Sequence, residues 1–387
     1  MIANNMDIKT ARNYLEIDLQ RLENNTSVVR RLVGEKVKIM GMVKGDAYGH
    51  GIQNCIKIFD KECDCYGVAS FEEATKLRNS GTTKDIMIFG WVPFIKLKEC
   101  IKNQFIINIF SLEYGKQVNS ALQDCDKKIR AHLEIDTGLG RTGFRCYSEN
   151  EISTVVEEIK QIFSSDKILV EGGFTHFASI DSTKEEDIQY AEMQHSYFKM
   201  VCSKLEASKT PFKIKHVSCS TAILRHRELD YDLVRAGKIL YGIGILPEDN
   251  IDNKIVPALS WRARVILVKT LKEGDAIGYG RTFKAKHDSK IAILSVGYGD
   301  GYHRHYSNKT FVIINNKKVP VIGSVSMDFM VVDVSTIDDI TFGDLATLIG
   351  DNPTSTLSIP TLDFARIGGA NSEATACITS RVPRYYK

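Results

Sequence analysis

The residues from Gly41 to Gly51 form the stretch of this chain with the clearest capacity for chemistry. They read Gly-Met-Val-Lys-Gly-Asp-Ala-Tyr-Gly-His-Gly, and an apolar run over residues 37–43 predicts a short buried strand that ends at Lys44. A lysine amine that is moved out of water has a lowered pKa and becomes a usable nucleophile, the state that a Schiff base needs. The glycines that follow predict a sharply turning backbone close to a ligand. Lys44 alone would better fit a surface lysine at a strand end, but the long specific string favours a functional one.

Four more polar segments, residues 134–143, 175–178, 216–221 and 234–237, lie at the ends of predicted strands farther along the chain. Segment 134–143 is rich in glycine and contains an anion partner, Arg141. The hydroxyls and backbone N–H groups of segment 216–221 suit a phosphate, and segment 234–237 lies beside it. Taken alone, His176 would be interpreted as a hydrogen-bonded histidine of the core, and Ser220 as a helix-capping residue. Their joint placement at predicted strand ends favours a ligand site instead. The candidates are Glu134, Arg141, His176, His216, Ser220, Arg235 and Gly237.

The elements that must position these residues alternate between strand and helix up to about residue 244. Eight such units in about 240 residues are typical of a (β/α)8 TIM barrel, in which the C-terminal strand ends form the active face. A doubly wound open sheet is the main alternative, because alternation alone does not distinguish the two. The predicted strands are residues 37–43, 65–69, 85–90, 105–110, 129–136, 172–177, 213–219 and 233–241, and the helices include residues 71–79, 111–124, 149–163 and 185–207.

The pattern changes after residue 244, where an acidic, asparagine-rich segment predicts a linker. Alternating runs without long helices then predict a mostly antiparallel β domain, with a hairpin turn at residues 315–317 and one helix near 361–366. The chain is therefore predicted to divide into a leader over residues 1–12, which pairs with the C-terminal domain, a barrel over 13–246 and a β domain over 247–387. The predicted strands of the β domain are residues 259–271, 290–296, 310–314, 318–322, 329–334 and 345–349.

Composition excludes several classes of protein. A formal net charge of +3 over 387 residues gives no case for nucleic acid binding. No apolar run approaches the roughly 18 residues that cross a bilayer, and no signal peptide opens the chain. Nine scattered cysteines indicate free thiols in a reducing, cytoplasmic compartment, and the spacing of Cys63 and Cys65 does not fit a metal site.

A strand-end lysine, a phosphate-binding segment and several arginines together indicate pyridoxal 5′-phosphate (PLP), with Lys44 as the residue that binds it covalently. Six strings that span both predicted domains in order resemble the alanine racemase family. They are residues 43–51, 136–143, 278–282, 297–302, 326–328 and 380–384.

The resemblance implies an N-terminal barrel, a C-terminal β domain and a homodimer whose active sites use both chains. Lys44 would be one acid–base, and Tyr279 of the partner subunit the other, with His216 hydrogen-bonded to that tyrosine. Two bases on opposite faces of the reacting carbon are what inversion requires. Arg235 would face the pyridine nitrogen with His176 behind it.

The remaining roles that the resemblance implies concern binding. Arg141 would contact the phenolic oxygen of the cofactor and the substrate carboxylate. The backbone N–H of Met327, in the string that ends at Asp328, would bind the same carboxylate across the interface. The phosphate would be held by Tyr48, Ser220 and Gly237, and the mouth of the access corridor would be formed by Tyr298, Asp300 and Arg304.

The chain departs from the family pattern at two positions. Glu134 replaces a lysine that is often carbamylated, and its carboxylate already supplies a partner for Arg141. Ser372 aligns with a tyrosine that crowds the substrate pocket, so Asn371 or Ser372 has room to bind a substrate hydroxyl. A site built to bind an OH can discriminate strongly for it. We therefore expect serine racemisation, above that of alanine.

The expected function is PLP-dependent racemisation of serine or alanine, which supplies D-amino acids for peptidoglycan precursors. The family also resembles the catalytic half of membrane-tethered serine racemases of glycopeptide (vancomycin) resistance, so a tether in a longer native chain is the alternative to a plain cytoplasmic enzyme. A non-catalytic PLP carrier and a barrel-type PLP decarboxylase are the alternative functions. The carrier resembles the barrel alone, whereas this chain adds a domain with Tyr279 and Met327.

Overall fold

The computed structural model describes residues 8–249 and 254–387, so residues 1–7 of the predicted leader lie outside the described residues. The described chain forms two compact units. We call Thr26–Lys44 together with Phe59–Leu240 the barrel unit. The sheet unit comprises Gly45–Ile58, Tyr241–Lys387 and the described residues before Thr26. The predicted division into residues 1–12, 13–246 and 247–387 stays a prediction.

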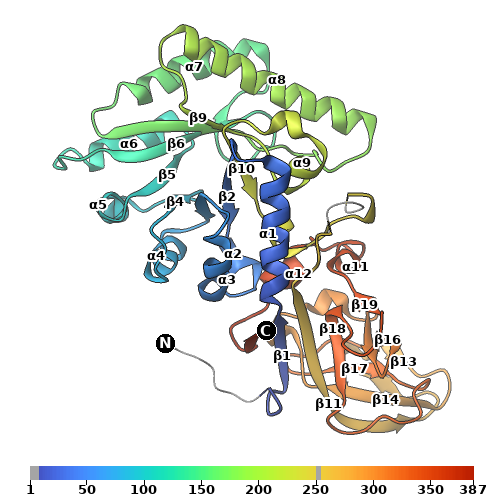
Figure 1. Ribbon diagram of the computed structural model, residues 1–387. Coiled ribbons are helices and arrows are strands. Elements are labelled where there is room, and N and C mark those ends of the chain that lie inside the picture. The colour runs from blue at the N-terminus through green and yellow to red at the C-terminus, as the bar shows by residue number, and fades with distance from the viewer. Residues whose placement is uncertain (1–7, 250–253) are drawn as a thin grey trace. The chain divides into compact units, whose positions relative to one another are not determined.

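The barrel unit contains eight parallel strands in the order β10-β2-β3-β4-β5-β6-β8-β9 (Figure 1). The two end strands are joined by backbone hydrogen bonds from Asp232 to Lys215 (3.1 Å) and from Arg235 to Ser218 (3.0 Å). These bonds close the sheet, which confirms the predicted barrel and excludes the open alternative. The strands are β2 (Lys38–Met42), β3 (Cys65–Val68), β4 (Asp85–Ile88), β5 (Phe105–Ile109), β6 (Ile129–Asp136), β8 (Ile168–Phe174), β9 (Ile214–His216) and β10 (Leu233–Ala236), and β7 (Phe144–Arg145) pairs with β6.

The last predicted strand, residues 233–241, is wrong in its second half. After Ala236 the chain turns into the short helix α10 (Lys238–Tyr241). The hydroxyl of Ser220 accepts the N–H groups of Gly237 (3.1 Å) and Ile239 (3.3 Å), which holds the chain in this turn. The apolar run over 239–241 is fully buried, and burial alone does not distinguish a helix from a strand.

Helices connect the strands and cover the barrel with amphipathic faces. In α7, Ile152, Val155, Val156, Ile159 and Ile162 recur at helical spacing and are all buried. None of the helices that the structure describes is both long and apolar enough to cross a membrane. The helices are α1 (Leu19–Val33), α3 (Ile52–Phe59), α4 (Phe71–Asn79), α5 (Leu97–Lys102), α6 (Leu112–Ala121), α7 (Glu149–Phe163), α8 (Glu185–Ala207) and α9 (Ser220–Arg225).

The sheet unit is a nine-stranded sheet in the order β19-β18-β15-β16-β17-β14-β11-β1-β20, and β18 also pairs with β11. All pairs are antiparallel except β1 with β20, which confirms the predicted mostly antiparallel domain. Its strands are β1 (Asn13–Ile17), β11 (Leu259–Leu271), β14 (Ser289–Leu294), β15 (Phe311–Ile314), β16 (Lys317–Ile322), β17 (Met330–Asp333), β18 (Leu345–Asp351), β19 (Ser358–Ile359) and β20 (Arg384–Tyr386), with helices α11 (Thr361–Ala365) and α12 (Glu373–Ala376).

The predicted hairpin turn joins β15 to β16. Ile314 and Lys317 pair directly, so Asn315 and Asn316 form a two-residue loop. Both have positive φ, 47° and 61°, as a type I′ turn requires. Asparagine tolerates this conformation better than most residues, which explains why the pair could be recognised in the sequence.

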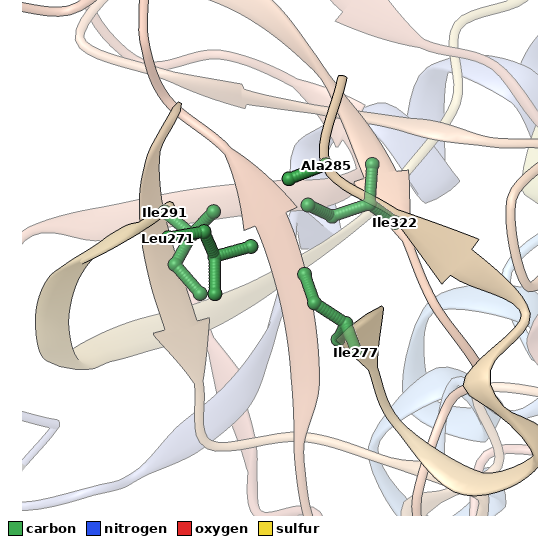
Figure 2. Packing of buried hydrophobic residues seen from close by; sticks show 5 residues of the cluster. All are labelled: Leu271, Ile277, Ala285, Ile291 and Ile322. Carbon is green, nitrogen blue, oxygen red and sulfur yellow. The ribbon is translucent and has the colours of Figure 1, made fainter. Parts of the chain in front are cut away.

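A second hairpin, β12 (Ala276–Ile277) with β13 (Phe283–Lys284), is anchored by a small hydrophobic core (Figure 2). Ile277 lies beside the side chain of Ile322 from β16, and Phe283 packs against the same cluster. The loop of this hairpin carries Tyr279. The position of that tyrosine therefore depends on this core, whose buried residues are Leu271, Ile277, Ala285, Ile291 and Ile322.

We expect Ile277→Ala to lower the free energy of unfolding of the sheet unit by about 2–3 kcal/mol, because it leaves a cavity in this core. Leu267→Ala is the matched control, since Leu267 is 47% exposed on β11 and its truncation should cost less than about 0.5 kcal/mol. Urea unfolding followed by the fluorescence of buried Trp261, in a Trp91→Phe background, measures both. Equal losses in the two variants would contradict the anchoring role.

Candidate active site

Lys44 lies where β2 ends and the chain enters a turn of unusual hand, α2 (Lys44–Tyr48). Gly45 (φ 63°, ψ 42°), Asp46 (52°, 50°) and Ala47 (59°, 50°) are all left-handed, and Tyr48 has φ 52°. For L-residues this conformation costs about 1–2 kcal/mol per residue, so three non-glycine residues in a row need strong support from their surroundings.

The support for this turn comes from hydrogen bonds within the sheet unit. Gly49 N–H donates to Gly45 O and Gly51 N–H to Asp46 O, each at 2.9 Å. The buried ring of His50 donates from Nδ1 to the carbonyls of Ala47 and Tyr48 (3.1 Å each). A Cβ on Gly49 would lie 2.1 Å from the carbonyl oxygen of Thr375, so only glycine fits there. The turn fixes where the lysine leaves the strand.

The environment of Lys44 favours the neutral amine. Lys44 is exposed to solvent, although protein atoms surround most of its amine. This burial, followed by the positive charge of Arg141 and, more weakly, that of Arg235, lowers the pKa of Lys44, while Glu73 opposes the shift. A lowered pKa is what a lysine needs in order to act as a nucleophile and proton acceptor at neutral pH.

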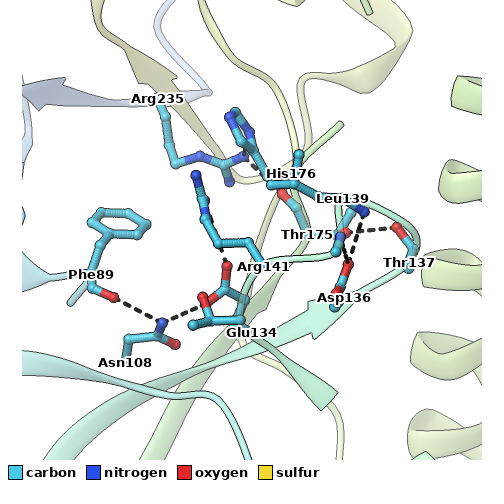
Figure 3. Close-up of polar contacts among 12 residues, drawn as sticks. Phe89, Asn108, Glu134, Asp136, Thr137, Leu139, Arg141, Thr175, His176 and Arg235 are labelled. Carbon is cyan, nitrogen blue, oxygen red and sulfur yellow. Dashed lines mark hydrogen bonds and ion pairs between the residues drawn. The ribbon is translucent and has the colours of Figure 1, made fainter. Parts of the chain in front are cut away.

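Glu134 and Arg141 form an ion pair at the end of β6 (Figure 3). Glu134 is buried, and its Oε1 lies 3.9 Å from Nη2 of Arg141, whose side chain is 58% exposed. The Oε2 atom accepts hydrogen bonds from Asn108 Nδ2 and Thr142 Oγ1, both at 2.7 Å. The carboxylate that we predicted as the partner of Arg141 is therefore held from three sides.

The loop that carries Arg141 is fixed by Asp136, a residue to which the sequence pattern alone assigned no role. One carboxylate oxygen, Oδ1, accepts the N–H groups of Gly138, Leu139 and Gly140 at 2.9–3.1 Å. The other, Oδ2, accepts the hydroxyl of Tyr147 at 2.7 Å. An aspartate directly before a glycine-rich loop is a recognisable turn signal, so the sequence did contain the clue. Asn108 carried no such signal.

Arg235 lies buried in the barrel and is surrounded by acceptors without a carboxylate partner among the described residues. Its Nη1 donates to the carbonyl (2.7 Å) and Nδ1 (2.8 Å) of His216. Its Nη2 donates to the carbonyls of Thr175 (2.8 Å) and Val217 (2.9 Å) and contacts His176 Nδ1 at 3.2 Å. Burial lowers the pKa of Arg235 to about 10, so it stays charged at neutral pH. Among the contacts of the described residues, the Nε–H alone is left for a ligand.

His216 does not have the partner that we expected. Its Nδ1 faces Arg235, and its Nε2 lies 2.9 Å from Nδ1 of His132. With both ring nitrogens used inside the barrel unit, His216 has no nitrogen left for Tyr279. His176 has one, because its Nδ1 faces Arg235 and its Nε2 carries the hydrogen. Burial and the charge of Arg235 lower the pKa of His176 to about 3, so its ring is neutral.

Ser220 and Gly237, the two predicted phosphate-binding residues of the barrel unit, lie together. The Ser220 hydroxyl oxygen accepts from the N–H groups of Gly237 and Ile239, so its own hydrogen points elsewhere. Ser220 starts α9, and Gly237 precedes α10. A hydroxyl and backbone N–H groups at two chain turns suit a phosphate group.

The other predicted residues belong to the sheet unit. Tyr279, Tyr298 and Met327 are exposed by 69%, 42% and 51% of their surface. Tyr298 and Arg304 line an open cavity of about 470 Å³. The fully buried Asp300 pairs with Arg12 and lies 3.5 Å from Arg381, which also donates to Asp328 at 2.5 Å. The predicted residues of this unit are Tyr48, Tyr279, Tyr298, Asp300, Arg304, Met327, Asp328, Asn371 and Ser372.

Asn371 and Ser372 lie directly before α12 and are half-buried. The Asn371 side chain occupies the space that a Cβ on Gly244 would fill, with Nδ2 only 2.4 Å from that point. Its Oδ1 is buried, and no described residue donates a hydrogen bond to it. A buried acceptor without a partner is costly unless a ligand or water completes it.

Comparison with known proteins gives a consistent result over the whole chain. Residues 17–244 match the family model "Alanine racemase, N-terminal domain" and residues 258–386 the model "Alanine racemase, C-terminal domain". The alanine racemase of Methanococcus maripaludis is 35% identical over 96% of this chain and 98% of its own length. The alanine racemase of Clostridium perfringens is 37% identical over 99% of this chain and 97% of its own length.

Solved structures agree with these relatives. Alanine racemase of Clostridium difficile 630 superposes with a TM-score of 0.86 at 32% identity and covers 98% of this chain and 96% of that one. Alanine racemase of Bacillus anthracis with bound L-Ala-P gives a TM-score of 0.87 at 29% identity. The superposition covers 97% of this chain and 95% of that one.

Glu134 yields a prediction about stability and pH. Burial raises its pKa above 4.5, although hydrogen bonds from Thr142 and Asn108 and the charges of Arg141 and Arg235 oppose the shift. The folded state therefore binds this proton more tightly than the unfolded chain, and ionisation costs stability as the pH rises. We expect Glu134→Gln to gain stability relative to the wild type as the pH rises above 4.5, the ordinary pKa of a glutamate carboxyl, in urea unfolding followed by circular dichroism.

The control for this prediction is Glu151→Gln, because the Arg145 hydrogen bond lowers the pKa of the Glu151 carboxyl. Its stability relative to the wild type should change in the opposite direction with pH. A Glu134→Gln variant that loses stability relative to the wild type as the pH rises would contradict the buried, costly carboxylate.

Proposed function

The chain belongs to the alanine racemase family and is a PLP-dependent amino-acid racemase, and we propose that it works by a two-base mechanism with Lys44 and the partner subunit's Tyr279. The observation that carries the proposal is the environment of Lys44, an amine with a lowered pKa at the end of a barrel strand. The barrel adds a buried arginine with one N–H left for a ligand and an anchored Arg141 for a carboxylate.

The residues present fit PLP. Lys44 provides the amine, Ser220 and Gly237 lie where a phosphate can be bound, and the Nε–H of Arg235 can face the ring nitrogen. Bound PLP supplies an aldehyde for amines and a ring that withdraws electrons from the bond to the α-proton. Because Arg235 keeps its proton at neutral pH, it would donate a hydrogen bond to that nitrogen without protonating it. Tyr48, four residues after Lys44, is proposed as a further phosphate ligand.

Inversion needs a proton acceptor on one face of Cα and a proton donor on the other. Lys44 serves one face in its neutral form. Tyr279 is proposed for the other, and its exposure, together with that of Met327, is what an interface residue shows before its partner covers it. We therefore propose a homodimer in which each site receives the partner subunit's Tyr279 and the partner subunit's Met327. His176, rather than His216, would donate from Nε2 to that tyrosine.

The substrate is proposed to be a small amino acid with a preference for serine. Arg141, held by Glu134, binds the carboxylate. The short side chain of Ser372 leaves room that a tyrosine would fill, and the buried Oδ1 of Asn371 is an acceptor that a substrate hydroxyl can complete. Tyr298, Asp300, Arg304 and Asp328 are proposed to shape the access corridor.

The setting that we propose is the cytoplasm, with the D-amino acid used for peptidoglycan precursors. A non-catalytic PLP carrier is less well supported, because it would leave the anchored hairpin of Tyr279 without a role. A decarboxylase is less well supported as well, since Arg141 and Glu134 are arranged to retain a carboxylate, which decarboxylation would remove.

The shared site predicts complementation between two inactive variants. Lys44→Ala and Tyr279→Phe should each lose nearly all racemisation, because each removes one of the two bases. In a mixed dimer, one site receives both intact residues and the other neither. Random mixing makes half of the dimers mixed, so co-expression should restore about one quarter of the wild-type activity.

Measurement uses two affinity tags, tandem purification of the mixed dimer and a D-amino-acid assay, with co-expressed Lys44→Ala chains as control. Recovery of no activity in the mixed dimer would place both bases in one chain. An active Tyr279→Phe enzyme would remove Tyr279 from the mechanism.

Substrate preference gives a separate prediction. We expect kcat/KM for L-serine to exceed that for L-alanine, and Ser372→Tyr to lower the serine-to-alanine ratio by about tenfold, because the ring refills the space for the hydroxymethyl group. Ser380→Tyr, the same change at an exposed serine, is the control and should leave the ratio unchanged. Negligible serine turnover by the wild type would exclude a serine racemase.

A further inference from the structure

His132 is a fully buried histidine of β6 that the mechanism above does not use. Its Nδ1 lies 2.9 Å from Nε2 of His216, and Nδ1 of His216 lies 2.8 Å from Nη1 of Arg235. The three side chains therefore form one chain of hydrogen bonds inside the barrel. It begins at the guanidinium group proposed to face the cofactor and ends at His132.

In this series of hydrogen bonds, the position of each hydrogen can be read from Arg235. A guanidinium group only donates, so Nδ1 of His216 must accept and the hydrogen of His216 must be on Nε2. That N–H points at His132, whose Nδ1 must then accept, which places the hydrogen of His132 on Nε2. No described residue accepts from this last nitrogen. The series of hydrogen bonds thus ends in a buried N–H group without a partner among the described residues. A purely structural core would avoid this unfavourable feature.

The fold makes two provisions for His132. The pairing of β6 with β8 shifts by one residue, because Ala131 faces Val170 whereas His132 faces Gly172. This bulge leaves Glu171 unpaired in the ladder, where it binds Arg130 instead. It also puts a glycine opposite the imidazole. A Cβ on Gly172 would lie 2.9 Å from Cε1 and 3.0 Å from Nδ1 of His132, so another residue would displace the ring.

Protonation would break this arrangement. A second hydrogen on His216 would face the Arg235 guanidinium, and a second hydrogen on His132 would face the N–H of His216. Burial, the charges of Arg235 and Arg130 and the neighbouring histidine all favour the neutral rings, and only Asp85 opposes them at His132. Phe174 stacks on His216 with ring centroids 4.8 Å apart, which holds the plane of the imidazole ring.

We propose that His132 is a positioning residue of the active site, which holds His216 in its Nε2–H form and so keeps the acceptor that orients Arg235. His132 touches neither substrate nor cofactor. It acts through His216, whose Nδ1 and carbonyl together take both hydrogens of Nη1 and leave the Nε–H of Arg235 in one direction. The inference rests on the proposed role of Arg235 for its effect on activity, but the hydrogen-bond chain itself can be tested without cofactor.

The first test uses the full-length protein without cofactor, labelled with 15N at histidine. We expect two neutral histidines, His132 and His216, that carry hydrogen on Nε2 and do not titrate between about pH 5 and pH 9. A scalar coupling across the N–H···N hydrogen bond should connect Nε2 of His216 to Nδ1 of His132. A His216 with hydrogen on Nδ1, titration of either ring in this range, or an absent coupling would each overturn the proposal.

The second test separates an acceptor from a packing group. His132→Asn keeps an acceptor near the Nδ1 position, and His132→Leu does not. His132→Leu leaves the Nε2–H of His216 buried without an acceptor, so we expect the ring to leave its position against Arg235 and lose its single Nε2–H form, with kcat/KM lowered by at least tenfold. His132→Asn should restore both to near wild-type values. His195→Leu is the matched control, since His195 also hydrogen-bonds in the barrel unit, to Tyr231 at 2.8 Å, but lies outside this chain.

Each outcome of the second test decides between the two roles. Equal defects in His132→Leu and His132→Asn would show that packing, not the acceptor, matters, and so would a wild-type His216 spectrum in His132→Leu. If His132→Leu does not fold, His132→Asn and the wild-type spectra still decide. A failure of the racemase proposal would appear as an inactive wild type with the predicted spectra intact, so the two failures are distinguishable.

Discussion

A permanent positive charge that is buried without a carboxylate partner among the residues that the structure describes is the constraint on which the barrel depends. Arg235 cannot lose its proton easily, so the interior must solvate it with carbonyls and lone pairs. Three carbonyl oxygens and the Nδ1 atoms of His176 and His216 do so. This requirement fixes the hydrogens on both rings and keeps them neutral. It also uses four of the five N–H groups of the guanidinium, so that the remaining one has a single direction.

The two residues that we propose as bases are positioned by different means. The turn that follows Lys44 is left-handed, and glycines and hydrogen bonds within the sheet unit support it against its steric cost. Tyr279 owes its position to a two-strand hairpin fixed by a small apolar core. Arg141, on a glycine-rich loop, is held by Asp136 through the backbone and by Glu134 through its side chain. In each case contacts from elsewhere hold in place a segment that its own sequence would leave unfavourable or loosely defined.

Much of the fold was predictable because its elements have strong local signals. Buried parallel strands produce continuous apolar runs, and the β6 prediction matches the observed Ile129–Asp136. The Asn315–Asn316 turn is recognisable for its tolerance of positive φ. Residues 238–241 were mistaken for a strand, because a short apolar run has no detectable period. His216 was given Tyr279 as its partner, although the barrel supplies it with Arg235 and His132.

The sequence by itself determined the alternation that makes a barrel, the antiparallel domain and the strand-end residues that indicate PLP chemistry, since these depend on residue type and short spacing. Only the tertiary structure decided which nitrogen of each histidine carries hydrogen and that Asn108 and Thr142 hold Glu134. It also decided that the hydrogen bonds that start at Arg235 end at His132. Such choices arise when strands distant in sequence meet inside a closed sheet. The partner of a buried polar atom is set there by geometry that no local pattern encodes.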